Sequence, residues 1–458
     1  MSDQGDRRSL TIGLMLAVAA IAFESYAVLT AMPAAAQDLG DLDLYAWTFT
    51  AFVIAMTFSI VASGQVTDRI GPVQPMIVGF VVFALGLAIA GAAPNMLVLL
   101  AARFVQGLGA GTMNVAVMVL IARVFDERER ATLMTWFSAC WMVPAFIGPT
   151  VAATIAETTS WHWVFWSVLP LMAVAGALVI GPLRRVTLSI EEPHQIKKRL
   201  LWLAALVAAG TAALQWAGQT LDLASALWGI AGVAAIAVGL PPLMPKGFTW
   251  IPHRISGVIG ARLFSAGAFF GAQAFLTLAL IQGRGISLIT AGIILAVGAL
   301  GWMAGALMQS QSWLHLSRDQ LIQLGVAAIA AGIALLSVAA FLPWLWIGVL
   351  LLGWILAGFG MGIQNASTSL AIMQMSSEAE LGRNTSALQV GESLGSSLFT
   401  GVAGAWFTWW RVRSADEVTF GGLFAVMAVV GLFAIWSARH IGTVQNHSLK
   451  GAAEAADE

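Results

Sequence analysis

Long apolar runs separated by short polar turns dominate this chain of 458 residues. A helix that crosses a bilayer needs about 20 mostly apolar residues, so each run of that length predicts one membrane span. Such runs fall at residues 10–32, 45–63, 75–92, 96–124, 131–156, 162–183, 200–217, 223–243, 258–281, 288–308, 321–342, 344–375, 386–407 and 420–438. The pattern therefore predicts an all-α membrane protein with fourteen transmembrane helices.

Polar segments divide these predicted spans into groups of six, two and six. We expect an N-terminal six-helix bundle at residues 1–184 and a C-terminal one at 258–440, followed by a cytoplasmic tail at 441–458. Between the bundles, residues 185–257 hold a charged linker and a transmembrane hairpin at about 200–217 and 223–243. Because the inserted hairpin has an even number of spans, both bundles keep the same orientation.

A glycine-rich pattern occurs twice. Residues 107–114 read GLGAGTMN, and residues 358–365 read GFGMGIQN, a shift of 251 positions that preserves three glycines and an asparagine. The chain is therefore predicted to contain two parallel repeats. Repeated halves around a cavity at the bilayer midplane are the architecture of secondary transporters.

Composition agrees and excludes several other classes. Only 10% of residues are charged, against about 25% in soluble domains. A net charge of −1 argues against nucleic-acid binding. The single cysteine, Cys140, excludes a disulfide framework, and the six histidines are too scattered for a metal site. With no catalytic constellation either, we expect no enzyme, no metal and no cofactor.

The basic residues predict the orientation. With the N-terminus inside, cytoplasmic segments hold 18 of the 22 Lys and Arg residues, Arg262 among them. Only Arg284, Arg411 and Arg413 fall outside, and Arg103 lies within a span. Under the positive-inside rule both termini are cytoplasmic in a multi-pass inner (cell) membrane protein. The excess of Arg over Lys, 18 against 4, is typical of a GC-rich bacterium.

Three ionisable residues stand out inside predicted spans, where charge is costly and usually functional: Glu24, Arg103 and Glu392. Glu24 and Arg103 both lie about 10–12 Å below the outer surface, at 1.5 Å per residue. At that depth burial favours the neutral form of a carboxyl group, whereas a nearby arginine favours the charged form. These opposing effects suit a group that must bind and release a proton. A static structural ion pair is the alternative.

Glu392 lies near the cytoplasmic end of its span. It either reaches the interface or serves as a second protonation site. Neutral polar residues inside the spans either line a substrate cavity or form helix–helix hydrogen bonds. The candidates for cavity lining are Tyr26, Gln106, Asn114, Gln273, Gln364, Asn365 and Gln389.

The turn between the second and third spans reads GQVTDRIG at residues 64–71 and resembles the signature loop of the major facilitator superfamily. In that family the loop is a conformational latch between the halves, which would here involve Gly64, Asp68, Arg69 and Gly71. Pro72 and Val73 replace the basic residues that usually follow.

Three further segments are similar to motifs of that superfamily. Residues 99–110 resemble the fourth-helix motif, whose arginine (here Arg103) the family links to proton coupling. Pro144, Gly148 and Pro149 resemble the antiporter motif of the fifth helix, with alanines at 152–153 where glycines are usual. Residues 23–33 resemble the first-helix motif of the fourteen-helix drug:proton antiporters, with Glu24 in place of an aspartate.

These resemblances imply a major-facilitator-type fold and a proton-driven efflux antiporter of small lipophilic or amphipathic compounds such as drugs. The proton gradient supplies the energy, and the partners are the substrate, protons and the bilayer. We expect a monomer. The alternatives are a dedicated exporter of one metabolite, siderophore or lipid precursor, and a non-transporting membrane sensor.

Overall fold

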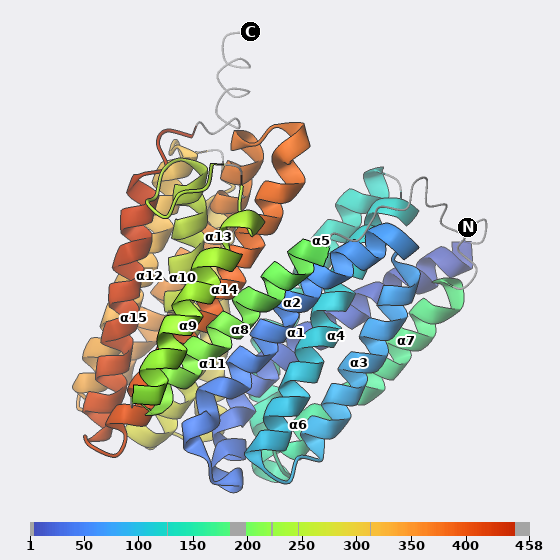
Figure 1. The fold of residues 1–458 in the computed structure, drawn as a ribbon. Helices are drawn as coiled ribbons and strands as arrows, with labels where there is room; N and C mark the ends of the chain where they lie inside the picture. The colour runs from blue at the N-terminus through green and yellow to red at the C-terminus, as the bar shows by residue number, and fades with distance from the viewer. Residues whose placement is uncertain are drawn as a thin grey trace. The chain divides into compact units, whose positions relative to one another are not determined.

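The computed structural model describes residues 4–125, 127–183, 198–220, 223–245, 247–311 and 313–444, and these ranges contain no β-strand (Figure 1). Thirteen helices in them are long and apolar enough to cross a membrane. The predicted all-α membrane protein is therefore confirmed. Most of the predicted charged linker and nearly all of the predicted tail lie outside the described residues.

The remaining predicted span, residues 386–407, lies in one continuous helix, α14 (Glu378–Trp410). This helix is long enough but is not among the thirteen that qualify by apolarity. Ser386, Gln389, Glu392 and Ser396 interrupt its apolar residues. All fourteen predicted spans thus coincide with helices in the described part of the chain.

The chain folds into two compact units. Unit 1 comprises Met1–Ala212 and Ser287–Ala296, and unit 2 comprises Ala213–Ile286 and Val297–Glu458. The predicted boundaries of the bundles, at residues 184 and 258, remain predictions drawn from the sequence repeat.

Unit 1 is a helical bundle in which the predicted sixth span consists of two helices, α6 and α7, separated at Ser167. Its elements are α1 (Gln4–Leu39), η1 (Leu42–Leu44), α2 (Tyr45–Ile70), α3 (Val73–Gly91), α4 (Met96–Val124), α5 (Glu127–Thr158), α6 (His162–Trp166) and α7 (Val168–Leu183). The first part of α8 (Lys198–Thr220) and of α11 (Leu288–Met308) also belongs to this unit.

Unit 2 contains the rest of α8 and α11 and the helices of the second repeat. Its other elements are α9 (Leu223–Gly239), η2 (Pro241–Leu243), α10 (Ile255–Arg284), α12 (Arg318–Phe341), α13 (Ile347–Met375), α14 and α15 (Asp416–Arg439). The second part of α8 packs on α14, where a Cβ on Gly218 would lie 2.6 Å from the Cβ of Ala405.

Local sequence signals set several helix ends. The Asn95 side chain accepts a hydrogen bond from the Val98 amide at 3.0 Å and so caps the N-terminus of α4. Ser317 and Gln320 form a capping box at the start of α12. Gly285 ends α10 in the left-handed region, at φ 62°, a conformation that glycine adopts without strain.

The repeated glycines make equivalent contacts in the two units. In unit 1, a Cβ on Gly107 or Gly111 of α4 would collide with the backbone of α2, and one on Gly109 with α3. In unit 2, Gly358 and Gly362 of α13 approach α11 in the same way, and Gly360 approaches α12. Small residues at these positions let helix backbones pack closely. The packing thus matches the predicted repeat.

The first helix of each repeat is also equivalent. In unit 1, α1 packs against α5 and α7, and in unit 2, α10 packs against α14 and α15. These central helices carry much of each core. Both also carry a charged residue, which is described next.

Candidate functional site

Unit 1 contains a fully buried ion pair between α1 and α4. Glu24 is 1% exposed and Arg103 is 3% exposed. Nη1 of Arg103 donates to Oε1 of Glu24. The structure therefore brings together the two residues that the sequence placed at the same depth.

Arg103 has three further partners. Its Nε donates to the carbonyl oxygen of Thr48 at 3.0 Å, and Nη1 donates to Oε1 of Gln106 at 2.6 Å. The guanidinium carbon lies 4.4 Å from the centre of the Phe52 ring, a cation–π contact. These groups would continue to stabilise the arginine cation if Glu24 lost its charge.

Glu24 has a less complete set of partners. Within the part of the chain that the structure describes, its Oε2 is buried and accepts no hydrogen bond. A buried charge without full hydrogen bonding is costly. A proton can bind at Oε2 while Oε1 keeps its contact with Arg103.

The predicted antiporter motif of α5 packs against α1, the helix that carries Glu24. A Cβ on Gly148 would lie 3.4 Å from Tyr26 Cβ and 3.6 Å from the Phe23 ring, so Gly148 approaches α1 on both sides of Glu24. Pro144 and Pro149 are buried within α5. Ala152, at a position where the motif usually has glycine, packs with Ala27 and Ala31 of α1 in a buried hydrophobic cluster.

Unit 2 contains a second ion pair, between α10 and α14, of which only the arginine is fully buried. Nε and Nη2 of Arg262 contact Oε2 of Glu392 at 3.0 and 2.9 Å. Nη1 donates to the Asn365 carbonyl at 2.6 Å and to Oγ1 of Thr368 at 2.7 Å, both on α13. Arg262 is 2% exposed, whereas the Glu392 side chain is 18% exposed.

Two of the predicted cavity-lining residues belong to this second site. Nδ2 of Asn365 donates to Oε1 of Glu392 at 3.4 Å. Gln364 is fully buried and bonds through its amide to Ser265 of α10. These two side chains therefore hold α10, α13 and α14 together around the ion pair.

Arg262 is a candidate site residue that the sequence analysis does not single out. The distribution of basic residues predicts a cytoplasmic position for Arg262, but the side chain is buried, and it is the fifth residue of the predicted span 258–281. The signal was present, because an intramembrane acid such as Glu392 needs a partner.

The other candidates do not gather at either pair. Gln273 is buried on α10, Asn114 is half-buried on α4, and Gln389 is exposed on α14. Their role in lining a cavity stays a prediction.

The predicted latch lies at the junction of α2 and α3. Gly71 ends α2 at φ 82°, and its amide donates to the Thr67 carbonyl at 2.9 Å. Arg69 is exposed, and a Cβ on Gly64 would meet nothing within 4 Å. The Asp68 side chain lies outside what the structure describes.

Known proteins are similar to this chain in sequence or in fold. The Multidrug transporter protein MdtP of Bacillus subtilis (strain 168) is 26% identical over 88% of this chain and 75% of its own. Multidrug resistance protein 3 of the same organism is 26% identical over 78% of this chain and 71% of its own. A solved POT family transporter in complex with a thioalcohol-conjugated peptide has a TM-score of 0.70 at 15% identity, covering 95% of this chain and 97% of that one.

The sequence model of the Major Facilitator Superfamily matches residues 14–353, which include α2 to α12 in full. The matched proteins are transporters rather than enzymes. The chain therefore belongs to the Major Facilitator Superfamily, as a multi-pass membrane transporter.

Proposed function

We propose that this transporter is a proton-coupled exporter that exchanges protons for small lipophilic or amphipathic compounds by alternating access. One observation carries the proposal. Glu24, a buried carboxylate on α1, is paired with Arg103 and keeps one oxygen without a hydrogen-bond partner among the described residues. Intramembrane acids of this kind mark proton pathways in transporters.

The chemistry of the pair supports coupling. A proton at Oε2 of Glu24 removes its negative charge, and Arg103 is then held by Thr48, Gln106 and Phe52. The net charge of the site changes by one unit, and this change biases the equilibrium between conformations. A charge moving through 100 mV supplies about 2.3 kcal/mol. The proton gradient can therefore drive transport without a cofactor.

The direction of transport rests on α5. Gly148, whose segment resembles the antiporter motif, contacts Phe23 and Tyr26 of α1, the helix that carries Glu24, and this contact supports export. The substrate class rests on the two bacterial relatives, whose names describe multidrug transport and resistance. Substrate would enter from the cytoplasm or the inner leaflet and exchange with a proton taken up from outside.

Glu392 is proposed as a second protonation site. The Glu392 side chain is 18% exposed, so a proton can reach its carboxylate, whereas the Arg262 side chain is only 2% exposed. Arg262 acts here as a positioning residue, because it fixes Oε2 of Glu392 through two nitrogens and anchors itself on α13 through Asn365 and Thr368.

The membrane placement is also a proposal. The distribution of Lys and Arg in the sequence favours an inner (cell) membrane protein with both termini cytoplasmic, and we expect it to act as a monomer. A dedicated exporter of one metabolite, siderophore or lipid precursor would share the same coupling site. A non-transporting sensor would tolerate neutralisation of Glu24.

The test uses proteoliposomes loaded with a pH-sensitive dye, to which tetraphenylphosphonium, ethidium or an antibiotic is added. We expect substrate-dependent proton movement with the wild type and none with Glu24→Gln. Glu129→Gln is the matched control, because Glu129 also pairs with an arginine, Arg7, but its side chain is 38% exposed. Transport without proton movement, or an unimpaired Glu24→Gln, would contradict the proposal.

A further inference from the structure

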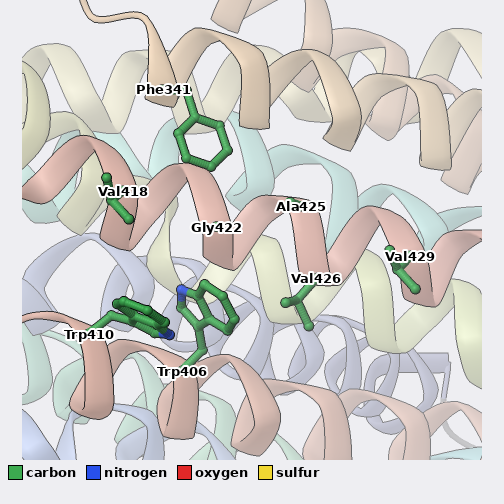
Figure 2. A pocket seen from close by; sticks show the side chains of 8 residues that line it. All are labelled: Phe341, Trp406, Trp410, Val418, Gly422, Ala425, Val426 and Val429. Carbon is green, nitrogen blue, oxygen red and sulfur yellow. The ribbon is translucent and has the colours of Figure 1, made fainter. Parts of the chain in front are cut away.

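A groove with almost entirely apolar walls runs along the surface of unit 2, between α12, α14 and α15 (Figure 2). Its volume is about 440 Å³, within the range of about 300–1,000 Å³ that is usual for ligand sites. Phe341, Trp406 and Trp410 form its aromatic sides, and α15 forms its floor from Val418 to Val429. None of its lining residues belongs to either ion pair, and the proposed exchange of protons does not use it.

The aromatic walls are fixed in place. Nε1 of Trp406 donates to the Thr419 carbonyl at 3.0 Å, so the indole has no polar group left to satisfy. A Cβ on Gly422 would collide with the Trp406 ring, and one on Gly421 would lie 2.5 Å from Phe341. Two adjacent glycines therefore let both rings lie directly against α15. A groove built in this way is preformed, which lowers the entropic cost of binding.

The length of the groove matches one leaflet of a bilayer. Val418 lies in the first turn of α15, and Val429 lies eleven residues further along the helix. At 1.5 Å per residue this is about 16 Å, roughly half of the 30 Å hydrocarbon thickness. A single acyl chain that enters at the α14–α15 turn would reach the bilayer midplane where the groove ends.

Charged residues of both signs lie in and just after the α14–α15 turn, between the lining residues Trp410 and Val418 in sequence or next to them. Arg413 is exposed, donates from Nη1 to the Trp409 carbonyl at 2.6 Å, and stacks its guanidinium 3.7 Å from the Trp409 ring. The planar guanidinium of an exposed arginine is suited to a phosphate group. Asp416 and Glu417 begin α15 beside it and are suited to an ammonium group.

We propose that this groove is a binding site for one phospholipid whose headgroup carries both a phosphate and an ammonium, such as phosphatidylethanolamine. One acyl chain lies between Trp406, Phe341 and α15, and the phosphate contacts Arg413. A purely anionic headgroup would meet the two acids and bind more weakly.

The test is native mass spectrometry of the delipidated full-length protein, titrated with phosphatidylethanolamine, phosphatidylglycerol or diacylglycerol. Val426→Trp fills the groove with an apolar side chain. Leu432→Trp is the matched control, because Leu432 is 57% exposed on the same helix and does not line the groove. Arg413→Gln removes the phosphate contact.

We expect saturable retention of phosphatidylethanolamine by the wild type and by Leu432→Trp, and at least tenfold weaker retention by Val426→Trp. Arg413→Gln should remove the preference for phosphatidylethanolamine over diacylglycerol. Equal retention by Val426→Trp, measured on monodisperse protein with unchanged helicity, would overturn the proposal. Displacement of bound lipid by tetraphenylphosphonium at the concentration that saturates transport would also overturn it, by assigning the groove to the transported compound.

Discussion

The two members of the unit 1 pair are unequal at the scale of single residues. Arg103 has a carbonyl, an amide oxygen and an aromatic face besides Glu24. The described residues offer Glu24 one charged partner and no hydrogen bond to Oε2. Loss of the arginine should therefore cost more stability than loss of the carboxylate charge.

This inequality predicts the stability of three variants. Arg103→Met leaves a buried carboxylate without its partner and should cost about 3–5 kcal/mol. Glu24→Gln should cost less, because Arg103 keeps its other acceptors, and the double variant should recover part of the Arg103→Met loss. Thermal unfolding in detergent measures all three. A double variant that shows the simple sum of the two losses would mean that the pair is not coupled.

The unit 2 pair gives a prediction about stoichiometry. If Glu392 takes up a proton during transport, Glu392→Gln should move one proton fewer for each substrate, while transport itself continues. The ratio is measured from dye-reported protons and radiolabelled substrate in proteoliposomes. Glu380→Gln is the control, because Glu380 lies in the first turn of the same helix and contacts only Ser377 among the partners described. An unchanged ratio would assign Glu392 to structure alone.

At this scale the sequence identified Glu24 and Arg103 because both lie deep inside long apolar runs. It missed Arg262 because an arginine at the fifth residue of a predicted span is indistinguishable from one at the interface. Only the packing of α10, α13 and α14 shows that Asn365, Thr368 and Glu392 surround it. The partners come from segments more than 100 residues away, and no local pattern encodes them.

At the scale of helices, glycines determine which faces meet. A Cβ on Gly362 would collide with the Trp302 carbonyl of α11. Gly362→Leu should therefore prevent α13 from packing and sharply reduce the yield of folded protein. Gly181→Leu is the matched control, because a Cβ on Gly181 of α7 would meet nothing within 4 Å. Size-exclusion chromatography of the detergent-extracted protein measures the difference, and equal yields would contradict this account of the packing.

Helix positions were predictable because an apolar run of bilayer length has few alternatives to a membrane span. The ends were less predictable. Within the predicted eighth span, 223–243, the α-helix α9 ends at Gly239 and the short 3-10 helix η2 follows. The α-helix cannot continue because Pro241 and Pro242 have no amide hydrogen to donate. The predicted sixth span is divided at Ser167, because Pro170 has no amide hydrogen to donate to the carbonyl of Trp166.

At the scale of the whole molecule, the proposed orientation predicts which loops face outward. In a Cys140→Ala background, Val412→Cys, 70% exposed at the α14–α15 turn, should react with a membrane-impermeant maleimide in intact cells. Gln311→Cys, exposed after α11, should react only once the membrane is permeabilised. The reverse pattern would overturn the inside placement of the basic residues and the direction of export.

The whole account depends on Glu24 giving up a proton when substrate binds. The most direct measurement adds tetraphenylphosphonium to purified protein in lightly buffered detergent solution and records proton release, without any need for a membrane or a gradient. The account predicts that the wild type and Glu129→Gln release protons when substrate binds. Glu24→Gln should release one proton fewer for each substrate bound. Wild-type release that persists in full in Glu24→Gln, or substrate binding without any release, would contradict it.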